Sequence, residues 1–211
     1  MTRVLLSLAY LPPVSWWAVA LKYGNVSLEY CETYPKQTYR NRCHILGANG
    51  LMPLSIPVIK VNGNHTMTSG IRIDYSRNWQ NIHWRSIEAA YGKAPYFLYY
   101  KDFFEPVYSG RIELLADLNL TLIKIIAKVL KRGGIVFEPT SEFNPAVQIP
   151  DYRQRIHPKK PPLSFGSPDY ARYMQVFESS FDFLPDLSII DLIFNQGPSA
   201  VYYLRDLASG L

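Results

Sequence analysis

Cationic side chains are concentrated in residues 36–42, within the densest polar stretch of the chain. Lys36, Arg40 and Arg42 supply positive charge, and the fork of an arginine guanidinium matches the oxygens of a phosphate or carboxylate. Asn41 adds an amide that can hydrogen-bond a sugar or a base. These residue types predict an anion-binding site. The alternative is a solvated loop whose cations pair with the two glutamates that precede it.

A histidine between two tryptophans marks a second candidate site. The imidazole of His83 has the chemistry of a general base, a proton shuttle or a phosphate donor. The rings of Trp79 and Trp84 can stack on a base or sugar, although such rings more often belong to a core. We expect His83 as a catalytic residue and Trp79 as a substrate contact. The alternative is a structural histidine with its hydrogen bonds satisfied.

Two more polar features could serve a ligand. Asp191 lies in the apolar stretch 187–194, where a carboxylate must meet a partner such as an arginine or lysine. We assign it to substrate binding. A second basic cluster, residues 153–160, suits an anion or is simply solvated. Cys31 and Cys43 lack a paired C-x-x-C spacing, so we expect reduced thiols, no metal site and no identifiable cofactor.

Charge and absent motifs narrow the function. Twenty-two Lys and Arg against 17 Asp and Glu give a net charge of +5, which suits an anionic ligand such as a nucleotide, a phosphate or an activated sugar. A nucleic-acid partner is not expected, because no recognisable module accompanies the charge. The G-x-G-x-x-G, Walker, G-x-S-x-G and H-E-x-x-H patterns are missing, which argues against dehydrogenases, P-loop enzymes, α/β-hydrolases and zincins.

The elements that must position these residues begin with a βαβ unit. Residues 4–10 form a short apolar run typical of a buried strand, 14–23 have helical spacing ended by Gly24, and 25–30 alternate as a strand. Parallel strands are expected, with the polar stretch just beyond the end of the second. Ligands of open α/β sheets bind outside those strand ends.

The rest of the chain predicts mostly helices. Strands are expected at 52–61 and 71–75, either paired as a hairpin or further apart, and a short buried strand at 135–137. Helices are expected at 80–91, 96–108, 111–132, 187–194 and 199–207. Residues 141–167 lack periodicity and predict a mobile loop that closes over the site. The fold class is therefore α/β: a small, mostly parallel sheet flanked by helices, with a helical C-terminal part.

Length and hydropathy set the context. The 211 residues are most simply one domain, 1–211. No stretch approaches about 18 uninterrupted apolar residues, so no membrane span is expected. The apolar run near the N-terminus is short, stops at two prolines and has no clean cleavage site. A cytoplasmic location follows as an expectation.

The sequences of several segments, spread over nearly the whole chain, are similar to those of the WbqC-like family. The carrying segments are Ala9-Tyr10-Leu11-Pro12-Pro13, Lys36-Gln37-Thr38-Tyr39-Arg40-Asn41-Arg42-Cys43, Ile45-Leu46-Gly47-Ala48-Asn49-Gly50, His83-Trp84-Arg85-Ser86-Ile87, Ala89-Ala90-Tyr91, Tyr173-Met174-Gln175-Val176-Phe177, and Leu187-Ser188-Ile189-Ile190-Asp191-Leu192-Ile193-Phe194 with Gly197-Pro198. Tyr10 is added to the substrate-binding residues on this ground.

The resemblance implies a cytoplasmic protein associated with O-antigen and other surface polysaccharides. It implies a transferase that modifies a nucleotide-activated or phosphorylated sugar or envelope precursor, by acyl or aminoacyl transfer. The alternative is a non-catalytic ligand-binding or assembly protein of the envelope pathway, so enzymatic activity stays open. Many relatives carry His-x-Pro before Tyr-Leu-Pro. Here the corresponding stretch, Leu6–Ala9, has no histidine, which leaves His83 as the group that could replace it.

Overall fold

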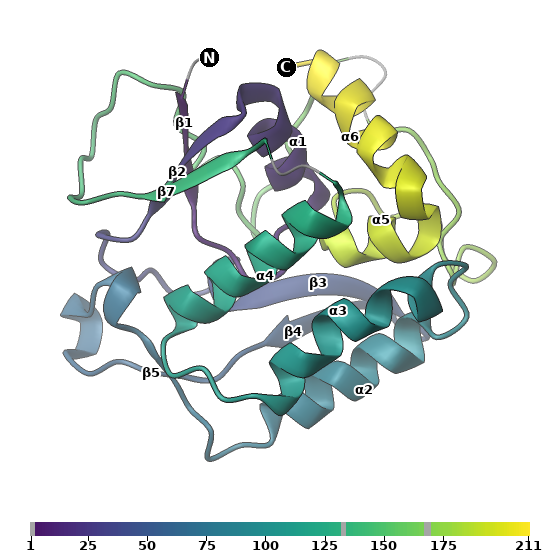
Figure 1. Ribbon diagram of the computed structural model, residues 1–211, viewed down its shortest axis with the longest axis horizontal. Coiled ribbons are helices and arrows are strands. Elements are labelled where there is room, and N and C mark those ends of the chain that lie inside the picture. Colours follow the sequence, from purple (N-terminus) through teal and green to yellow (C-terminus); the bar gives the residue numbers. More distant parts are fainter. Residues whose placement is uncertain (1–2, 132–133, 167–169) are drawn as a thin grey trace.

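The first thirty residues form the expected βαβ unit in the computed structural model, which describes residues 3–131, 134–166 and 170–211 (Figure 1). Strand β1 (Arg3–Ser7) runs parallel to β2 (Asn25–Glu29), and helix α1 (Val14–Tyr23) connects them. Gly24 ends α1 with a φ of 71°, a left-handed conformation that suits glycine. Strand β7 (Val136–Pro139) pairs in parallel with the other edge of β2, giving the order β1-β2-β7.

Two antiparallel pairs accompany this sheet. The hairpin of β3 (Arg42–Gly47) and β4 (Gly50–Ser55) was not predicted, because no strand was expected at residues 42–47. The expected strand 52–61 is divided between β4 and β5 (Val58–Ile59). Strand β5 pairs with β6 (Arg72–Ile73), which confirms the hairpin alternative for that part.

The helices follow the predicted ranges closely. They are α2 (Trp79–Tyr91), α3 (Phe97–Ser109), α4 (Leu115–Val129), α5 (Ile189–Gln196) and α6 (Ala200–Ser209), with short 3-10 turns at Gly63–His65, Thr68–Gly70 and Gly197–Ser199. Helix α4 begins four residues later than predicted, because Glu113 and Leu114 are held extended against β6. Its expected last residue, 132, lies outside the described residues. Helix α6 packs beside α1, and α2 beside α3 (Figure 1).

One cluster of buried hydrophobic side chains draws on all six of these helices and on β1 to β3. Trp16 and Trp17 of α1 lie against Phe137 of β7, with ring centroids 6.1 Å apart in each pair. The sheet and the helices therefore share a core, while the single domain over 1–211 stays a prediction.

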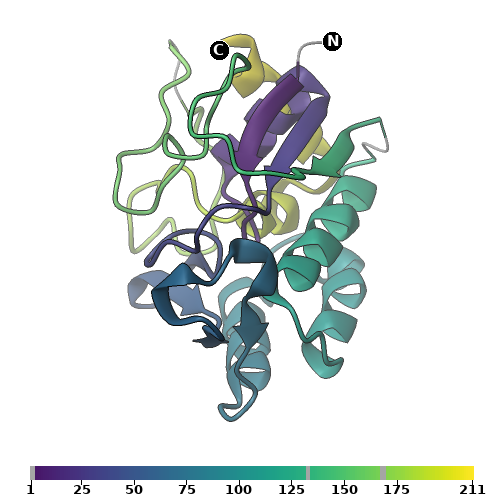
Figure 2. The ribbon, with the colours of Figure 1, turned by 90° about the vertical axis from the view of Figure 1, so that its left-hand side faces the viewer.

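The predicted loop is irregular but firmly attached. Residues 141–166 contain no helix or strand, as expected, and position 167 lies outside the described residues. The backbone N–H of Leu5 donates to the carbonyl of Pro150, and the carbonyl of Leu5 accepts from the N–H of Tyr152. These bonds place residues 150–152 along the free edge of β1, and Figure 2 shows this segment beside the sheet. Tyr152, Leu163 and Phe165 are buried. Exposed residues 159–162 are therefore the part best placed to close over a ligand, and that closure stays a prediction.

Candidate functional site

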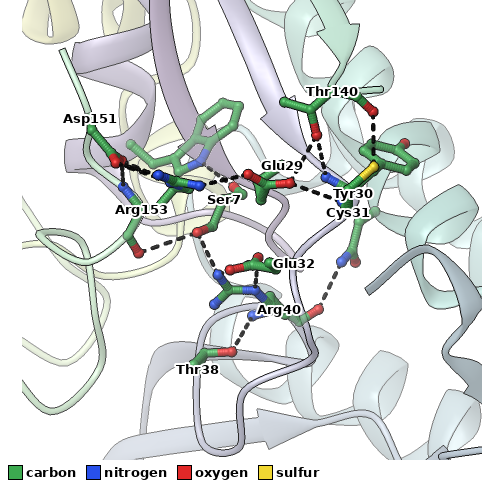
Figure 3. A network of polar contacts seen from close by, with 12 residues as sticks. Ser7, Glu29, Tyr30, Cys31, Glu32, Thr38, Arg40, Thr140, Asp151 and Arg153 are labelled. Carbon is green, nitrogen blue, oxygen red and sulfur yellow. Dashed lines mark hydrogen bonds and ion pairs between the residues drawn. The ribbon is translucent and has the colours of Figure 1, made fainter. Parts of the chain in front are cut away.

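A buried polar network lies at the carboxyl ends of the parallel strands (Figure 3). Glu29, the last residue of β2, is 1% exposed. Its carboxylate accepts hydrogen bonds from Nη1 of Arg153 at 2.8 Å, from Oγ1 of Thr140 at 2.9 Å and from the backbone N–H of Cys31 at 2.9 Å. This edge of the sheet is where α/β proteins bind ligands, yet here its charges are already paired.

Arg153 is fully engaged within the protein. Its Nε and Nη2 donate to the carboxylate of Asp151, with Nη2 to Oδ2 at 2.7 Å, and Nη2 also donates to the carbonyl of Asn144 at 2.9 Å. With Glu29 on the remaining nitrogen, every nitrogen of the guanidinium donates to a group of the protein. Arg153 therefore attaches the irregular segment to the sheet.

Arg40, predicted to bind the anion, is also paired. It is 3% exposed, its Nε donates to Oε1 of Glu32 at 2.6 Å, and its Nη2 donates to Oγ of Ser7 at 2.7 Å. Burial raises the pKa of Glu32 and the charge of Arg40 opposes that rise. The alternative in which these cations pair with nearby glutamates thus holds for Arg40, in a buried rather than a solvated setting.

The hydroxyl of Ser7 joins the two basic segments of the sequence. It accepts from Arg40 and donates to the backbone carbonyl of Arg153 at 3.2 Å, as Figure 3 shows. Residues 38–42 and 151–153 are therefore held at one place beyond the end of β1.

Beyond this network the basic segment 155–160 lines one cavity of about 340 Å³ together with Tyr39 and His44, and it is here called the basic cavity. Its walls comprise Tyr39, His44, Leu51, Arg155, Ile156, His157, Pro158, Lys160, Pro161, Pro162, Leu163, Leu184, Pro185, Asp186 and Leu187. Arg155 and Lys160 form no ion pair among the described residues. Arg155 and Lys160 outnumber the one carboxylate of the lining, Asp186, so the lining carries a net positive charge.

Arg42 adds to that charge. Alternate residues of a strand point to the same face, so Arg42 shares a face of β3 with His44, which lines the basic cavity. The Nε of Arg42 is buried without a hydrogen-bond partner, and its guanidinium has no ion pair within the described part of the chain. A buried donor of this kind is costly unless a ligand or water satisfies it.

Both histidines of the basic cavity are uncharged near neutral pH. Burial lowers the pKa of His44, and the charge of Arg42 lowers it further. Burial also lowers the pKa of His157, assisted by Lys160, Arg40, Lys159 and Arg42 in that order. The pKa of this one imidazole is therefore lowered by cations of both basic segments.

Hydrogen bonding assigns the tautomer of His157. Its Nδ1 accepts from the backbone N–H of Lys159 at 3.1 Å, so the proton of the neutral ring is on Nε2. That N–H is a donor for an anion. His44 is packed edge-on against Tyr39, with ring centroids 5.6 Å apart.

His83, predicted as the catalytic residue, lies in an aromatic cluster. It is 3% exposed, its Nδ1 accepts from the hydroxyl of Tyr10 at 2.9 Å, and its ring packs edge-on against Trp79. The hydroxyl of Tyr10 also bonds that of Tyr108 at 2.8 Å. Burial lowers the pKa of His83 to about 4, against a smaller effect of its hydrogen bond to the backbone of Ser55.

This arrangement brings Tyr10, Trp79 and His83 together, but away from the basic cavity, which none of them lines. The three other cavities described do not include them either. The catalytic role of His83 and the substrate contacts of Tyr10 and Trp79 remain predictions.

Asp191 occupies a separate buried cluster on α5. Its Oδ2 accepts from the hydroxyl of Tyr173 at 2.6 Å and from Nε2 of Gln175 at 3.0 Å. Burial raises the pKa of Asp191 to about 6, and these donors lower it in part. The partners are neutral groups, whereas a lysine or arginine was expected. The carboxylate holds residues 173–175 against α5, and its assignment to substrate binding remains a prediction.

The other predicted residues are separated by the fold. Lys36 is exposed, and Nδ2 of Asn41 donates to the carbonyl of Ile56 at 2.8 Å. Sequence reasoning missed Tyr39, His44 and Lys160 as cavity residues. The basic cluster 153–160 was the available signal, but the sequence did not show that it would meet residues 39–44.

The described residues contain no group of three or more His, Cys, Asp or Glu side chains placed to bind a metal ion. Within the same part of the chain, no helix is both long and apolar enough to cross a membrane.

Comparison with known proteins gives a family and one relative. A family model described as WbqC-like protein family matches residues 9–149. The chain is 27% identical over 200 residues to an uncharacterized protein of Mycobacterium tuberculosis, Rv1507c, and the match covers 82% of this chain and 84% of that protein. No solved structure matches the chain.

Proposed function

The chain belongs to the WbqC-like protein family, and we propose that it is a transferase that binds a phosphorylated or nucleotide-activated precursor and modifies a sugar or envelope component. The observation that supports this is one cavity lined by Arg155, His157 and Lys160 together with Tyr39 and His44. Tyr39 and His44 flank Arg40 and Arg42, and they are more than a hundred positions from residues 155–160.

The anion would bind cations that form no ion pair within the described residues. Arg42 supplies a guanidinium with an unbonded, buried Nε, and Lys160 supplies an ammonium on the wall of the cavity that donates to the carbonyl of Gln154 at 2.7 Å. The Nε2–H of His157 adds a neutral donor. An arginine fork together with point donors suits the tetrahedral oxygens of a phosphate.

The proposed reaction is acyl or aminoacyl transfer. The amine or hydroxyl of the acceptor forms a bond to the acyl carbon, and the bond from that carbon to the leaving oxygen or sulfur of the activated acyl donor breaks. The proton of the attacking group passes to a neutral imidazole and from there to the leaving group. The lowered pKa of His44 keeps it unprotonated at neutral pH, and the acceptor nitrogen of His157 is already bonded to the N–H of Lys159, so His44 is the cavity imidazole suited to this step. His83 stays the alternative base.

One observation favours a second candidate, a binding protein without turnover. The predicted catalytic histidine, His83, is buried and lines none of the four cavities described. Such a protein would hold the same anionic ligand in the basic cavity and pass it to a partner.

A thermal-shift screen tests the proposal. The panel contains phosphate, nucleotides, nucleotide-sugars and acyl donors, and a ligand at 100 times its dissociation constant adds about 2.7 kcal/mol of stability. We expect stabilisation that is lost in Arg42→Gln and kept in Arg85→Gln, a control at an exposed position of α2. No stabilisation by any anion would refute the proposal. Release of the leaving group from a stabilising acyl donor then separates transferase from binding protein.

A further inference from the structure

The residues that line the basic cavity are of two chemical kinds. Donors and cations come from Tyr39, His44, Arg155, His157 and Lys160. Most of the other lining residues are apolar and are here called the apolar wall, namely Leu51, Ile156, Pro158, Pro161, Pro162, Leu163, Leu184, Pro185 and Leu187. A lining of this composition offers apolar contact that inorganic phosphate or a bare sugar phosphate would not use.

The apolar wall is preformed. Four of its residues are prolines, whose fixed φ angles leave little freedom to lose on binding. Two of its residues, Leu163 and Leu187, are buried, at 9% and 2% exposure. The wall therefore needs no rearrangement to receive an apolar group.

Leu51 stands at the exposed border of this wall. It belongs to β4, opposite Leu46 of β3, and is 55% exposed while Leu46 is buried. A ligand group that covered Leu51 would remove apolar surface from water. Such burial is favourable by about 25 cal/mol per Å², or about 0.8 kcal/mol for each CH₂.

The carboxylate of Asp186 does not oppose this arrangement. Both of its oxygens are bound at the start of α1, where the backbone N–H of Ser15 donates at 2.7 Å and its hydroxyl donates at 2.9 Å. Among the residues that line the cavity, the two cations Arg155 and Lys160 outnumber this one carboxylate. Arg42 lies on the face of β3 that it shares with His44.

We infer that the ligand of the basic cavity is an organic phosphate that carries a short apolar group beside its phosphate, such as an acyl phosphate or a phosphate ester with an acyl-like chain. The phosphate faces Arg42, His157 and Lys160, and the chain lies on the leucine and proline wall. This inference rests on the proposed function for its anion and adds that the cavity holds the acyl donor rather than the sugar acceptor.

The size of the cavity limits the chain. About 340 Å³ is near the lower end of the range of small-molecule sites, roughly 300–1,000 Å³. The cavity accepts a phosphate with a chain of a few carbons, so affinity rises with chain length only until the wall is covered.

A titration series of alkyl phosphates tests this. Inorganic, methyl, ethyl, butyl and hexyl phosphate are titrated calorimetrically into the whole protein, with butanol as the uncharged probe. We expect binding to tighten by up to about fourfold for each added CH₂ over the first carbons. Leu51→Ser reduces the gain from methyl to butyl phosphate and leaves methyl phosphate unchanged. Leu98→Ser, at an exposed position of α3, has no effect.

The role of the cations is tested by Lys160→Gln, which is expected to weaken the binding of methyl phosphate and of butyl phosphate by the same factor. Both Leu51 and Lys160 are exposed, so these variants are expected to fold. A series in which methyl and butyl phosphate bind equally well would overturn the inference and leave the proposed function standing. Butanol binding as tightly as butyl phosphate would also overturn it. Absence of binding by every phosphate would overturn both.

Discussion

Removing the charge of Glu29 is the sharpest perturbation of the buried network. In Glu29→Gln the amide oxygen still accepts from Thr140 and the N–H of Cys31, so only the pairing with Arg153 changes. Breaking a buried ion pair by removal of one partner costs about 3–5 kcal/mol. Because Asp151 still neutralises Arg153 in part, we expect the lower end, about 3 kcal/mol.

The matched control is an exposed ion pair of the same sheet. Arg3 and Glu138 pair between β1 and β7 with half of each side chain exposed. Pairs of this kind contribute about 0–1 kcal/mol, so Glu138→Gln is expected to cost less than about 1 kcal/mol. Since about 1 kcal/mol shifts Tm by roughly 2–4 °C in a chain of this size, the two variants should differ by several degrees.

Urea unfolding followed by tryptophan fluorescence measures both variants. Trp16 and Trp17 pack against Phe137 of β7, so their emission reports on the sheet. The pairwise part comes from the double mutant Glu29→Gln with Arg153→Met. If the losses of stability of the two single variants sum to that of the double variant within about 0.5 kcal/mol, the idea that this ion pair fixes the irregular segment is refuted. A loss for Glu29→Gln no larger than that for Glu138→Gln would refute it as well.

Three further predictions concern titratable groups and thiols. The folded pKa of His83 is about 4, below its unfolded value of 6.5, so its contribution to stability is complete above pH 6.5 and is lost as pH falls toward 4. In chemical unfolding, His83→Gln should remove about 3 kcal/mol of this pH dependence. A pH profile of stability that is the same in the variant and the wild type would contradict the burial argument. For Asp191 the sign is opposite, since its folded pKa of about 6 exceeds 3.8, so stability is highest below about pH 4 and falls as pH rises through 6. The free energy of unfolding of Asp191→Asn, relative to that of the wild type, should therefore rise by about 3 kcal/mol between about pH 4 and pH 6. A difference in unfolding free energy that stays constant over this pH range would count against the prediction. Cys43 is 1% exposed and burial raises its pKa, whereas Cys31 is partly exposed. Ellman's reagent should titrate one thiol in the native protein and two in urea, and Cys31→Ser should abolish the native reaction.

Local pattern predicted most of the fold. The apolar run at 4–10, the helical spacing at 14–23 and the glycine at 24 all act within a few residues of one another, so the βαβ unit follows from the sequence alone. The start of α4 does not. Neither Glu113 nor Leu114 is a helix-breaking residue. They are extended because β6, about forty positions earlier, pairs with their backbone. Tertiary hydrogen bonds decided that boundary.

The candidate site was harder to predict, because charge type does not reveal pairing. Arg40 and Arg42 are two positions apart and look equivalent in the sequence. In the structure Arg40 is bound by Glu32 and Ser7, while Arg42 begins β3 on the same face of the strand as His44, which lines the basic cavity. The strand at 42–47 was not predicted, so the alternation that separates these arginines could not be used.

The two kinds of cation also explain why the protein keeps buried ion pairs that contribute little net stability. A buried pair can often be replaced by apolar residues at no loss, so stability alone is a weak reason for Arg40–Glu32 and Arg153–Glu29. Their geometry supplies another reason, since the hydroxyl of Ser7 contacts both arginine segments and fixes them relative to each other. Each paired arginine lies within a few residues of cations that face the cavity. The buried ion pairs thus set the positions of the cations that have no ion pair. Replacement of the pairs by apolar residues would keep the fold but leave the two arginine segments less firmly fixed relative to each other.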